Sequence, residues 1–261
     1  MIDPGSGWPT DRATRDTPVA VGAGDVLALA RQARSVEEVD ARSSVCRACP
    51  RLVQWREQVA EVKRASYSTE TYWGRPVTGW GPADAQIAVM GLAPAAHGGN
   101  RTGRIFTGDR SGDWLFAALH RAGLALEPTS TSAYDGQRLI DVRITLGVRC
   151  APPANKPTPA ERDACAPWLV RELQLLLPTL RAVVVLGGFA WSALWPALRA
   201  AGVDLPVRVP PFGHGVQVDL PRLTVLGCYH VSQQNTFTGR LTEVMLDEVF
   251  TRAQQACTVH P

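Results

Sequence analysis

The chain has 261 residues, 45% of them hydrophobic, and a formal net charge of +3. That length and apolar content are enough to bury a sizeable core, which excludes a disordered protein. No apolar run approaches the roughly twenty residues that span a bilayer, and the first residues lack the apolar segment of a secretory signal peptide. We therefore expect a globular cytoplasmic protein with no membrane partner, whose weak positive charge is compatible with nucleic-acid binding without requiring it.

The first 33 residues are rich in Gly, Pro, Asp and Thr. Such a composition is typical of a segment that does not pack, so residues 1–33 are predicted to form a disordered or loosely packed N-terminal tail. Nothing after Ala33 resembles an interdomain linker. Residues 34–261 are therefore expected to fold as a single domain.

Apolar runs predict four strands, at residues 87–90, 144–148, 183–186 and 223–228. Between and after them, helical spacing of apolar side chains and capping signals predict helices at about residues 111–122, 159–177, 189–200 and 239–256. Strands that alternate with helices indicate a parallel sheet covered on both faces. The predicted fold class is α/β, a three-layer α/β/α fold with a short four-stranded parallel sheet.

The loop after the first strand, GLAPAAHGGNRTGRIFTGD from Gly91 to Asp109, is the most informative stretch. Loops at the carboxyl ends of strands line the ligand crevice of an open α/β sheet. The spacing of Gly98 and Gly103 is that of a P-loop, but Arg104 stands where a lysine is required. No G-x-G-x-x-G follows the strand either, so a nucleotide hydrolase is disfavoured. The backbone N–H groups and arginines of the loop remain suited to the phosphates of a polynucleotide.

Six cysteines in a chain without an export signal argue against a disulfide framework. Four of them have metal-type spacing, a tight pair followed by two single residues: Cys46, Cys49, Cys150 and Cys165. A structural zinc site usually has a second tight pair, which is missing here. Spacing alone leaves an iron–sulfur cluster, zinc and unliganded thiols open. Cys228 and Cys257 are most simply core or surface thiols.

Three motifs together carry a resemblance. The loop described above, the segment NKPTPAE from Asn155 to Glu161 and the segment HVSQQN from His230 to Asn235 resemble, in this order, the family 5 uracil-DNA glycosylases. The resemblance extends from about Cys46 to Thr242. It implies the same fold and a [4Fe–4S] cluster on the four spaced cysteines. We expect a monomer, the default for an enzyme that must wrap a duplex. The implied activity flips uracil out of double-stranded DNA and hydrolyses its N-glycosidic bond, leaving an abasic site.

The resemblance also implies catalytic and base-binding roles. Phe106 is expected to stack on the flipped base, His230 to donate to the base oxygen as charge develops on it, and Asn155 to lie beside the base or the abasic sugar. Related families carry an acidic residue where this chain has Leu92 and Ala93. The nearest replacement is Asp109, later in the same loop.

Asp109 has two interpretations. It is a candidate to orient the attacking water, but its setting before Ser111 is also that of a helix N-cap. The base pocket is expected to include Phe106, Gly91, Leu92, Ala93 and Leu146. Leu146 stands where a related family has an asparagine that reads uracil. Because apolar pockets discriminate weakly, we expect hypoxanthine, xanthine and ethenocytosine as further substrates.

Six polar residues near these motifs are predicted to contact DNA: Arg101, Arg104, Gln233, Gln234, Asn235 and Arg240. The alternative function is an iron–sulfur nucleic-acid-binding protein without excision activity, which the missing acid at Leu92 and Ala93 favours.

Overall fold

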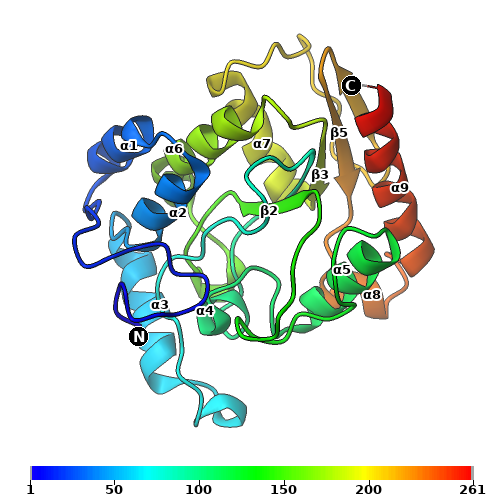
Figure 1. Ribbon diagram of the computed structural model, residues 1–261. Helices are drawn as coiled ribbons and strands as arrows, with labels where there is room; N and C mark the ends of the chain where they lie inside the picture. The colour runs from blue at the N-terminus through cyan, green and yellow to red at the C-terminus, as the bar shows by residue number, and fades with distance from the viewer. Residues whose placement is uncertain (1, 260–261) are drawn as a thin grey trace.

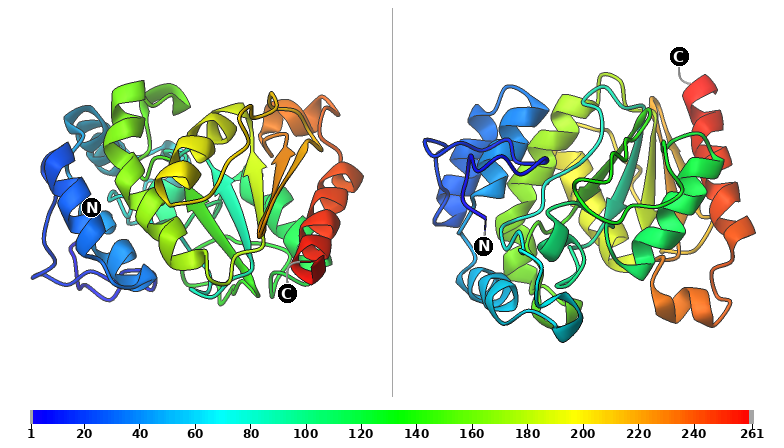
Figure 2. Two further views of the ribbon diagram at one scale, coloured as in Figure 1. Left: turned by 90° about the horizontal axis from the view of Figure 1, so that it is seen from above. Right: turned by 60° about the horizontal axis from the view of Figure 1, so that its bottom comes forward.

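The computed structural model describes residues 2–259, and these form a sheet with helices packed on both of its faces (Figures 1 and 2). The sheet has five strands in the order β2-β1-β3-β5-β4. Their bounds are β1 Ile87–Gly91, β2 Val142–Leu146, β3 Ala182–Leu186, β4 Gln217–Leu220 and β5 Leu223–Cys228. The first four strands in this order are parallel, whereas β4 pairs with β5 in the antiparallel sense. The α/β class and the layered architecture are confirmed, and the expected number of four strands is corrected to five.

The longer helices are α1 Ala23–Gln32, α2 Val36–Ser44, α3 Pro50–Val62, α5 Arg110–Arg121, α6 Pro159–Leu176, α7 Gly188–Ala200 and α9 Glu243–Val259. Two short helices, α4 Gly99–Thr102 and α8 Gln233–Phe237, lie within loops, as do the 3-10 turns at Ala65–Tyr67 and Pro153–Asn155. Among the described residues, no helix has the length and apolar character needed to cross a bilayer.

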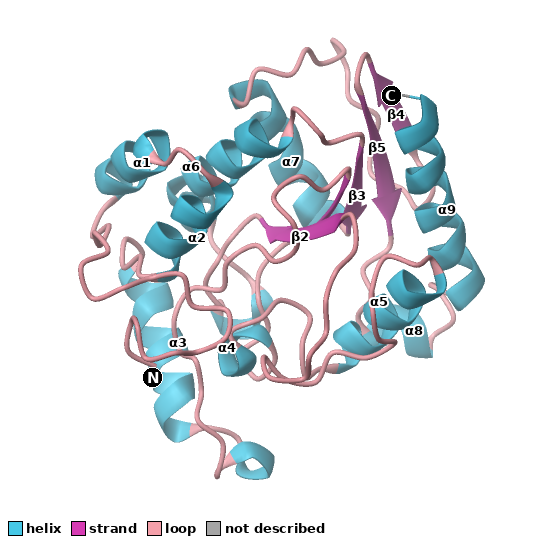
Figure 3. Ribbon diagram, viewed as in Figure 1, coloured by secondary structure: helices cyan, strands magenta, loops and turns pink. Residues whose placement is uncertain are grey.

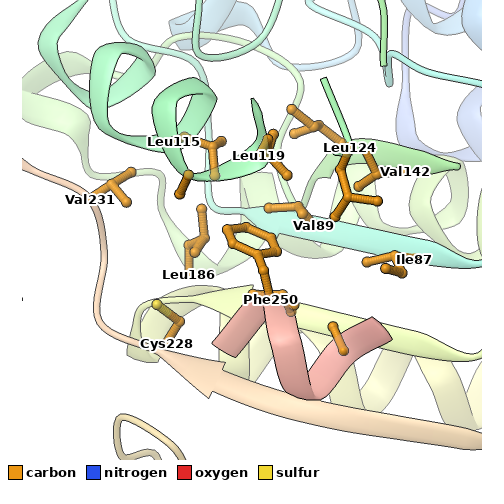
Figure 4. Close-up of a cluster of buried hydrophobic side chains, with 14 of the residues drawn as sticks. Ile87, Val89, Leu115, Leu119, Leu124, Val142, Leu186, Cys228, Val231 and Phe250 are labelled. Atoms are coloured by element: carbon orange, nitrogen blue, oxygen red, sulfur yellow. The ribbon is translucent and has the colours of Figure 1, made fainter. Parts of the chain in front are cut away.

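Alternate residues of each central strand enter two separate cores. Val89 of β1 packs with α5 and α9 on one face of the sheet, and Phe250 of α9 lies among the side chains of this cluster (Figure 4). Met90, the next residue, packs with α6 and α7 on the other face. Because both faces are buried, the strands read as continuous apolar runs, and this is why their positions were predictable.

The second strand lies two residues earlier than predicted. Arg143 and Thr145 interrupt its apolar pattern but are buried, because polar partners from other elements meet them inside the protein. The guanidinium of Arg143 pairs with Asp40 and with Glu172, at 2.8 and 2.6 Å. Thr145 donates to the second oxygen of Glu172. Such pairing makes buried polar side chains tolerable within a strand.

Within residues 2–33 the N-terminal segment makes tertiary contacts, which corrects the prediction of a disordered or loosely packed tail. The Nε1 of Trp8 donates to the carbonyl oxygen of Thr102 at 3.1 Å, and the buried Asp11 carboxylate pairs with Arg75 at 2.8 Å. Helix α1 packs with Trp168 of α6 in a small core of its own. The segment is polar in composition because it covers a surface that is already formed, so it needs few apolar residues.

Candidate active site

The three predicted catalytic residues and most of the predicted base-binding residues gather around one cavity of about 510 Å³ at the carboxyl ends of the parallel strands. Most of its wall comes from the loops after β1, β2, β3 and β5, and Phe212 joins it from the segment between α7 and β4. Figure 3 shows the loop segments that run between the sheet and α4, α5 and α8. Parallel strands bring the loops that follow them to the same edge of a sheet. The cavity therefore collects residues from Leu92 to Arg240 that are far apart in the sequence.

Phe106 lies in this cavity and is held in an unusual backbone conformation. Its φ of 49° places it in the left-handed region, which non-glycine residues rarely adopt. Its ring packs on Gly91, where an added Cβ would come within 3.1 Å of the ring atom Cζ. The ring centroid lies 6.1 Å from that of His230. The missing side chain of Gly91 thus leaves room for the ring of Phe106. This ring forms part of the cavity wall, with His230 beside it.

Asp109 lines the cavity and also caps helix α5. Its Oδ1 accepts a hydrogen bond from the backbone N–H of Gly112 at 2.9 Å, so the predicted N-cap is present. The carboxylate packs closely against Gly98, where an added Cβ would overlap it. Burial raises the pKa of Asp109, and the hydrogen bonds from Gly112 and Ser111 oppose that shift. The cap occupies Oδ1, and Oδ2 lies against Gly98 in the cavity wall.

His230 follows β5 and faces the same cavity. Burial lowers its pKa, which favours the neutral imidazole at neutral pH. The backbone carbonyl of His230 accepts a hydrogen bond from Nδ2 of Asn235 at 2.8 Å. Asn235 was predicted to contact DNA, but its amide is used to hold the histidine loop in place.

The loop after β2 supplies two more polar groups. Asn155 is exposed and lines the cavity. Its backbone is left-handed, with a φ of 55°, and so is that of its neighbour Ala154, with a φ of 53°. Lys156 follows and also reaches the mouth. The remaining wall of the cavity is apolar where the sequence predicted it, at Leu92, Ala93 and Leu146.

Two of the predicted DNA contacts are wrong, because Arg101 and Arg104 are buried inside the loop. Arg101 donates to the carbonyl oxygens of His97 and Gly108, both at 2.8 Å, and pairs with Glu70. Arg104 donates to Thr107, Ser130 and Asp135. Both guanidinium groups hold the backbone of the loop and are not available to phosphate.

The other polar candidates lie at the mouth of the cavity. Gln233 and Gln234 are exposed on α8, and Gln234 lines the cavity. Arg240 is exposed, with its guanidinium carbon 4.6 Å from the centre of the Tyr229 ring. Sequence reasoning missed the aromatic wall formed by Phe189, Phe212 and Tyr229. The Gly-Gly pair at residues 187–188, directly after the third strand, was the available signal for it.

The four spaced cysteines meet in a second, smaller cavity. They come from the loop after α2, the loop after β2, and α6. None forms a disulfide, and burial together with the neighbouring thiols raises the pKa of Cys49 to about 11. The backbone N–H of Arg149 donates to Sγ of Cys165 at 3.4 Å. Within residues 2–259, no three His, Cys, Asp or Glu side chains are arranged to hold a single metal ion.

A buried arginine accompanies these thiols. Arg56 is only 1% exposed, and its Nη1 donates to Sγ of Cys150 at 2.9 Å. Its Nε has no hydrogen-bond partner in the described structure, and its Nη2 forms a long ion pair, 3.8 Å, with Oε1 of Glu57. A buried cation is costly unless negative charge lies next to it. The cysteine cavity thus holds a positive charge that neutral thiols do not balance.

Comparison with known proteins assigns this arrangement first to a class. Residues 78–254 match the family model described as the uracil DNA glycosylase superfamily. This range covers all five strands, and it includes Asp109, Asn155 and His230.

Individual relatives narrow the assignment. A type-5 uracil-DNA glycosylase of Mycobacterium bovis is 58% identical over 97% of this chain and 94% of its own length. The type-5 uracil-DNA glycosylase of Thermus thermophilus is 51% identical over 81% and 94%. A type-4 uracil-DNA glycosylase of Thermotoga maritima is 33% identical over only 44% of this chain. The chain belongs to family 5 of the uracil-DNA glycosylase superfamily.

Proposed function

We propose that this protein excises uracil from DNA by hydrolysing the N-glycosidic bond, which leaves an abasic site. The observation that carries the proposal is the cavity itself, which brings an aromatic ring, a neutral histidine, an amide and a carboxylate together in a member of this family. A base inside a duplex is out of reach of any such cavity, so the nucleotide must be extruded into it.

Each group has a defined task in the reaction. Phe106 stacks on the extruded base, and Asn155 lies beside the base or its sugar. As the C1′–N bond breaks, its electron pair moves onto the base, and the His230 N–H donates to the base oxygen that becomes negative. A donor aimed at developing charge lowers the activation free energy by about 3–4 kcal/mol. Water adds to C1′, its proton passes to bulk solvent, and the Asp109 carboxylate orients that water.

The substrate range should be wider than uracil. The cavity is apolar at Leu146, the position at which a polar group would read the base edge. A wall without a hydrogen-bonding group rejects other bases weakly. We propose hypoxanthine, xanthine and ethenocytosine in double-stranded DNA as further substrates, with G-mispaired lesions favoured because they unstack more easily.

The mouth of the cavity supplies the DNA contacts. Arg240 is exposed and suited to a phosphate, and Gln233 and Gln234 are exposed on the short helix beside it. In this position the two glutamines fill the gap that the extruded nucleotide leaves in the stack. We further propose that the protein acts as a monomer in the cytoplasm, a compartment that keeps thiols such as Cys257 reduced.

We propose that Cys46, Cys49, Cys150 and Cys165, which line one cavity, hold a [4Fe–4S] cluster. Cluster ligation converts thiols to thiolates, and the net negative charge of a thiolate-bound cluster would balance the buried Arg56. The Nη1 of Arg56 already donates to Sγ of Cys150. The cluster would supply structural cross-linking, because its ligands come from three separate parts of the chain.

The test is base release from a labelled duplex with one U·G pair, with abasic sites revealed by alkali. We expect cleavage by the wild type and a loss of at least about 100-fold in Asp109→Asn. Asparagine is also an effective N-cap, so this variant keeps helix α5 and removes only the carboxylate. Equal cleavage by both proteins would restrict Asp109 to its capping role.

The same assay separates the alternative function. Tight binding of the U·G duplex without any base release, by a sample that contains iron, would favour the nucleic-acid-binding protein without excision activity. The observation behind that alternative is that Asp109 is the single carboxylate among the described residues that line the cavity, and one of its oxygens is already bonded.

A further inference from the structure

The active-site cavity extends beyond the part that a single base would fill. Its volume of about 510 Å³ is that of a site for a drug-sized ligand, whereas a pyrimidine is one six-membered ring. Phe106 and His230, whose rings lie beside each other, form the inner part. The outer part, between the start of α7 and the loop after β5, has aromatic walls. We name it the outer lobe and define it by Gly188, Phe189, Phe212, Tyr229 and Arg240.

The aromatic rings of the outer lobe support each other. The Phe212 ring lies against Gly188, where an added Cβ would be 3.5 Å from its Cδ1. The same ring is 6.0 Å from Trp191 and 6.3 Å from Tyr229, measured between centroids. Tyr229 in turn carries the Arg240 guanidinium over its face. The lobe therefore combines a fixed apolar wall with a cation at its rim.

Phe189 is the exception among these rings, because it remains 69% exposed. It occupies the second position of α7, a 13-residue helix whose start is fixed by hydrogen bonds. The N–H of Gly187 donates to the carbonyl of Cys228 at 2.8 Å, and the N–H of Trp191 donates to the carbonyl of Gly187 at 3.0 Å. A large apolar side chain is thus held in solvent on a rigid support, at the mouth of a nucleobase cavity.

Extrusion of a nucleotide creates the ligand that such a ring fits. When one base leaves the stack, each neighbouring base on that strand loses an aromatic stacking partner, which the amide side chains in the gap do not replace. Every base has a π face, so an aromatic side chain can cover it whatever its identity. A phosphodiester tethers the neighbour to the flipped nucleotide, which makes its effective concentration at the outer lobe high.

We propose that the outer lobe is a second nucleobase subsite, in which Phe189 stacks on the neighbour of the flipped nucleotide. This inference rests on the proposed glycosylase function and adds a residue that determines sequence context. Arg240 is placed at the rim for the phosphate that joins the two nucleotides. Because purines offer a larger face than pyrimidines, a purine neighbour is preferred.

The test measures coupling between Phe189 and the neighbouring base. Single-turnover base release is measured for wild type and Phe189→Ala on duplexes with adenine, or a base-free analogue, on the 5′ side and then the 3′ side of uracil. With adenine on the contacted side, Phe189→Ala should slow release by about 5-fold to 100-fold, the range that base–aromatic stacking supplies. With the base-free analogue on that side, the two proteins should react at the same rate.

Three further variants sharpen the outcome. Phe189→Trp should retain the dependence on adenine, and Phe189→Leu should lose most of it. Val244→Ala is the matched control, since Val244 is 67% exposed on α9 and lies outside the cavity. Phe237→Ala tests the neighbouring loop, because Phe237 is 68% exposed but does not line the cavity.

The result that overturns the subsite is a Phe189→Ala effect that is the same with adenine and with the analogue on both sides. Coupling that follows Phe237 in place of Phe189 would also overturn it. Both results leave the proposed function intact, because the wild type still releases uracil. The proposed function fails separately, if the wild type releases no base from any of these duplexes.

Discussion

The two cavities of this protein are joined by one short segment and are built in opposite ways. Leu146 ends β2 in the wall of the active-site cavity, and Cys150, four residues later, lies in the cysteine cavity. The first is open, with polar groups on loops and two exposed residues of left-handed backbone at its mouth. The second is small and mostly apolar apart from its thiols, its two arginines and Ser43. Substitutions in the active-site cavity should therefore change the chemistry while the fold persists. Substitutions in the cysteine cavity should damage the fold itself.

The largest expected effect is in the cysteine cavity. Cys150→Ser should abolish the visible absorbance and bound iron of the purified protein and lower its free energy of unfolding by several kcal/mol, because ligation is coupled to folding. Iron content and thermal unfolding measure this, with Cys257→Ser, on α9 and outside both cavities, as the control. A Cys150→Ser protein with unchanged melting temperature would remove the contrast between the two cavities.

His230→Ala should have the next largest effect, confined to chemistry. Loss of a donor aimed at developing negative charge should lower the single-turnover rate about 100-fold to 1,000-fold, with little change in melting temperature. His120→Ala, exposed on α5, is the matched control. If His230→Ala instead lost stability and activity in parallel, the histidine would be a structural residue like those around the cysteines.

The acid limb of the pH–rate profile should belong to Asp109. Burial raises the pKa of its carboxyl above the ordinary value of 3.8, so activity that needs the carboxylate should rise with pH through that raised pKa and be absent below it. In Asp109→Asn this limb should disappear along with most of the rate. An unchanged limb in the residual activity of the variant would assign it to another group.

The raised pKa of Asp109 has the opposite consequence for folding stability, which decreases as pH rises. A raised pKa means that the folded protein binds this proton more tightly than the unfolded chain. The resulting stabilisation is fully present below the unfolded pKa of Asp109 and is lost as pH rises through the folded pKa. Denaturant unfolding of wild type and Asp109→Asn should therefore show less dependence on pH across this window in the variant.

The smallest expected effects separate buried from exposed arginines. Arg240→Ala should weaken duplex binding several-fold and reduce the slope of log affinity against log salt by about 1, the value for one phosphate contact. Arg101→Ala should leave that slope unchanged and lower stability by about 1–3 kcal/mol, because it deprives the buried carbonyl oxygens of His97 and Gly108 of their donor. If the salt slope of Arg240→Ala were as unchanged as that of Arg101→Ala, Arg240 would contact no phosphate.

Most of the fold could be predicted because the central strands are buried on both faces. The runs that became β1, β3 and β5 were placed within one residue, since continuous burial leaves continuous apolar sequence. Strand β4 was not predicted, because it is a four-residue edge strand whose residues alternate between exposed and buried. The bounds of β2 were misjudged because Arg143 and Thr145 are buried only through partners that lie far away in the sequence.

The site was predictable to the same extent and for a related reason. Local sequence placed Asp109, His230 and Phe106 on loops at the carboxyl ends of strands, and the structure brings all three to one cavity. It could not separate arginines that bind phosphate from arginines that hold a loop. That distinction depends on Glu70 and Asp135, each 31 residues away from the arginine with which it pairs.

The direction of α9 has a practical consequence. Strand β5 runs toward the edge of the sheet that carries the active-site loops, whereas α9 packs against it and returns to the opposite edge, where the helix ends (Figure 1). A dye, an affinity handle or a surface linker joined at this end would thus stand on the side of the molecule remote from the DNA. Immobilised in this way, the protein would present its cavity to solution, which suits single-molecule measurements of how it scans a duplex.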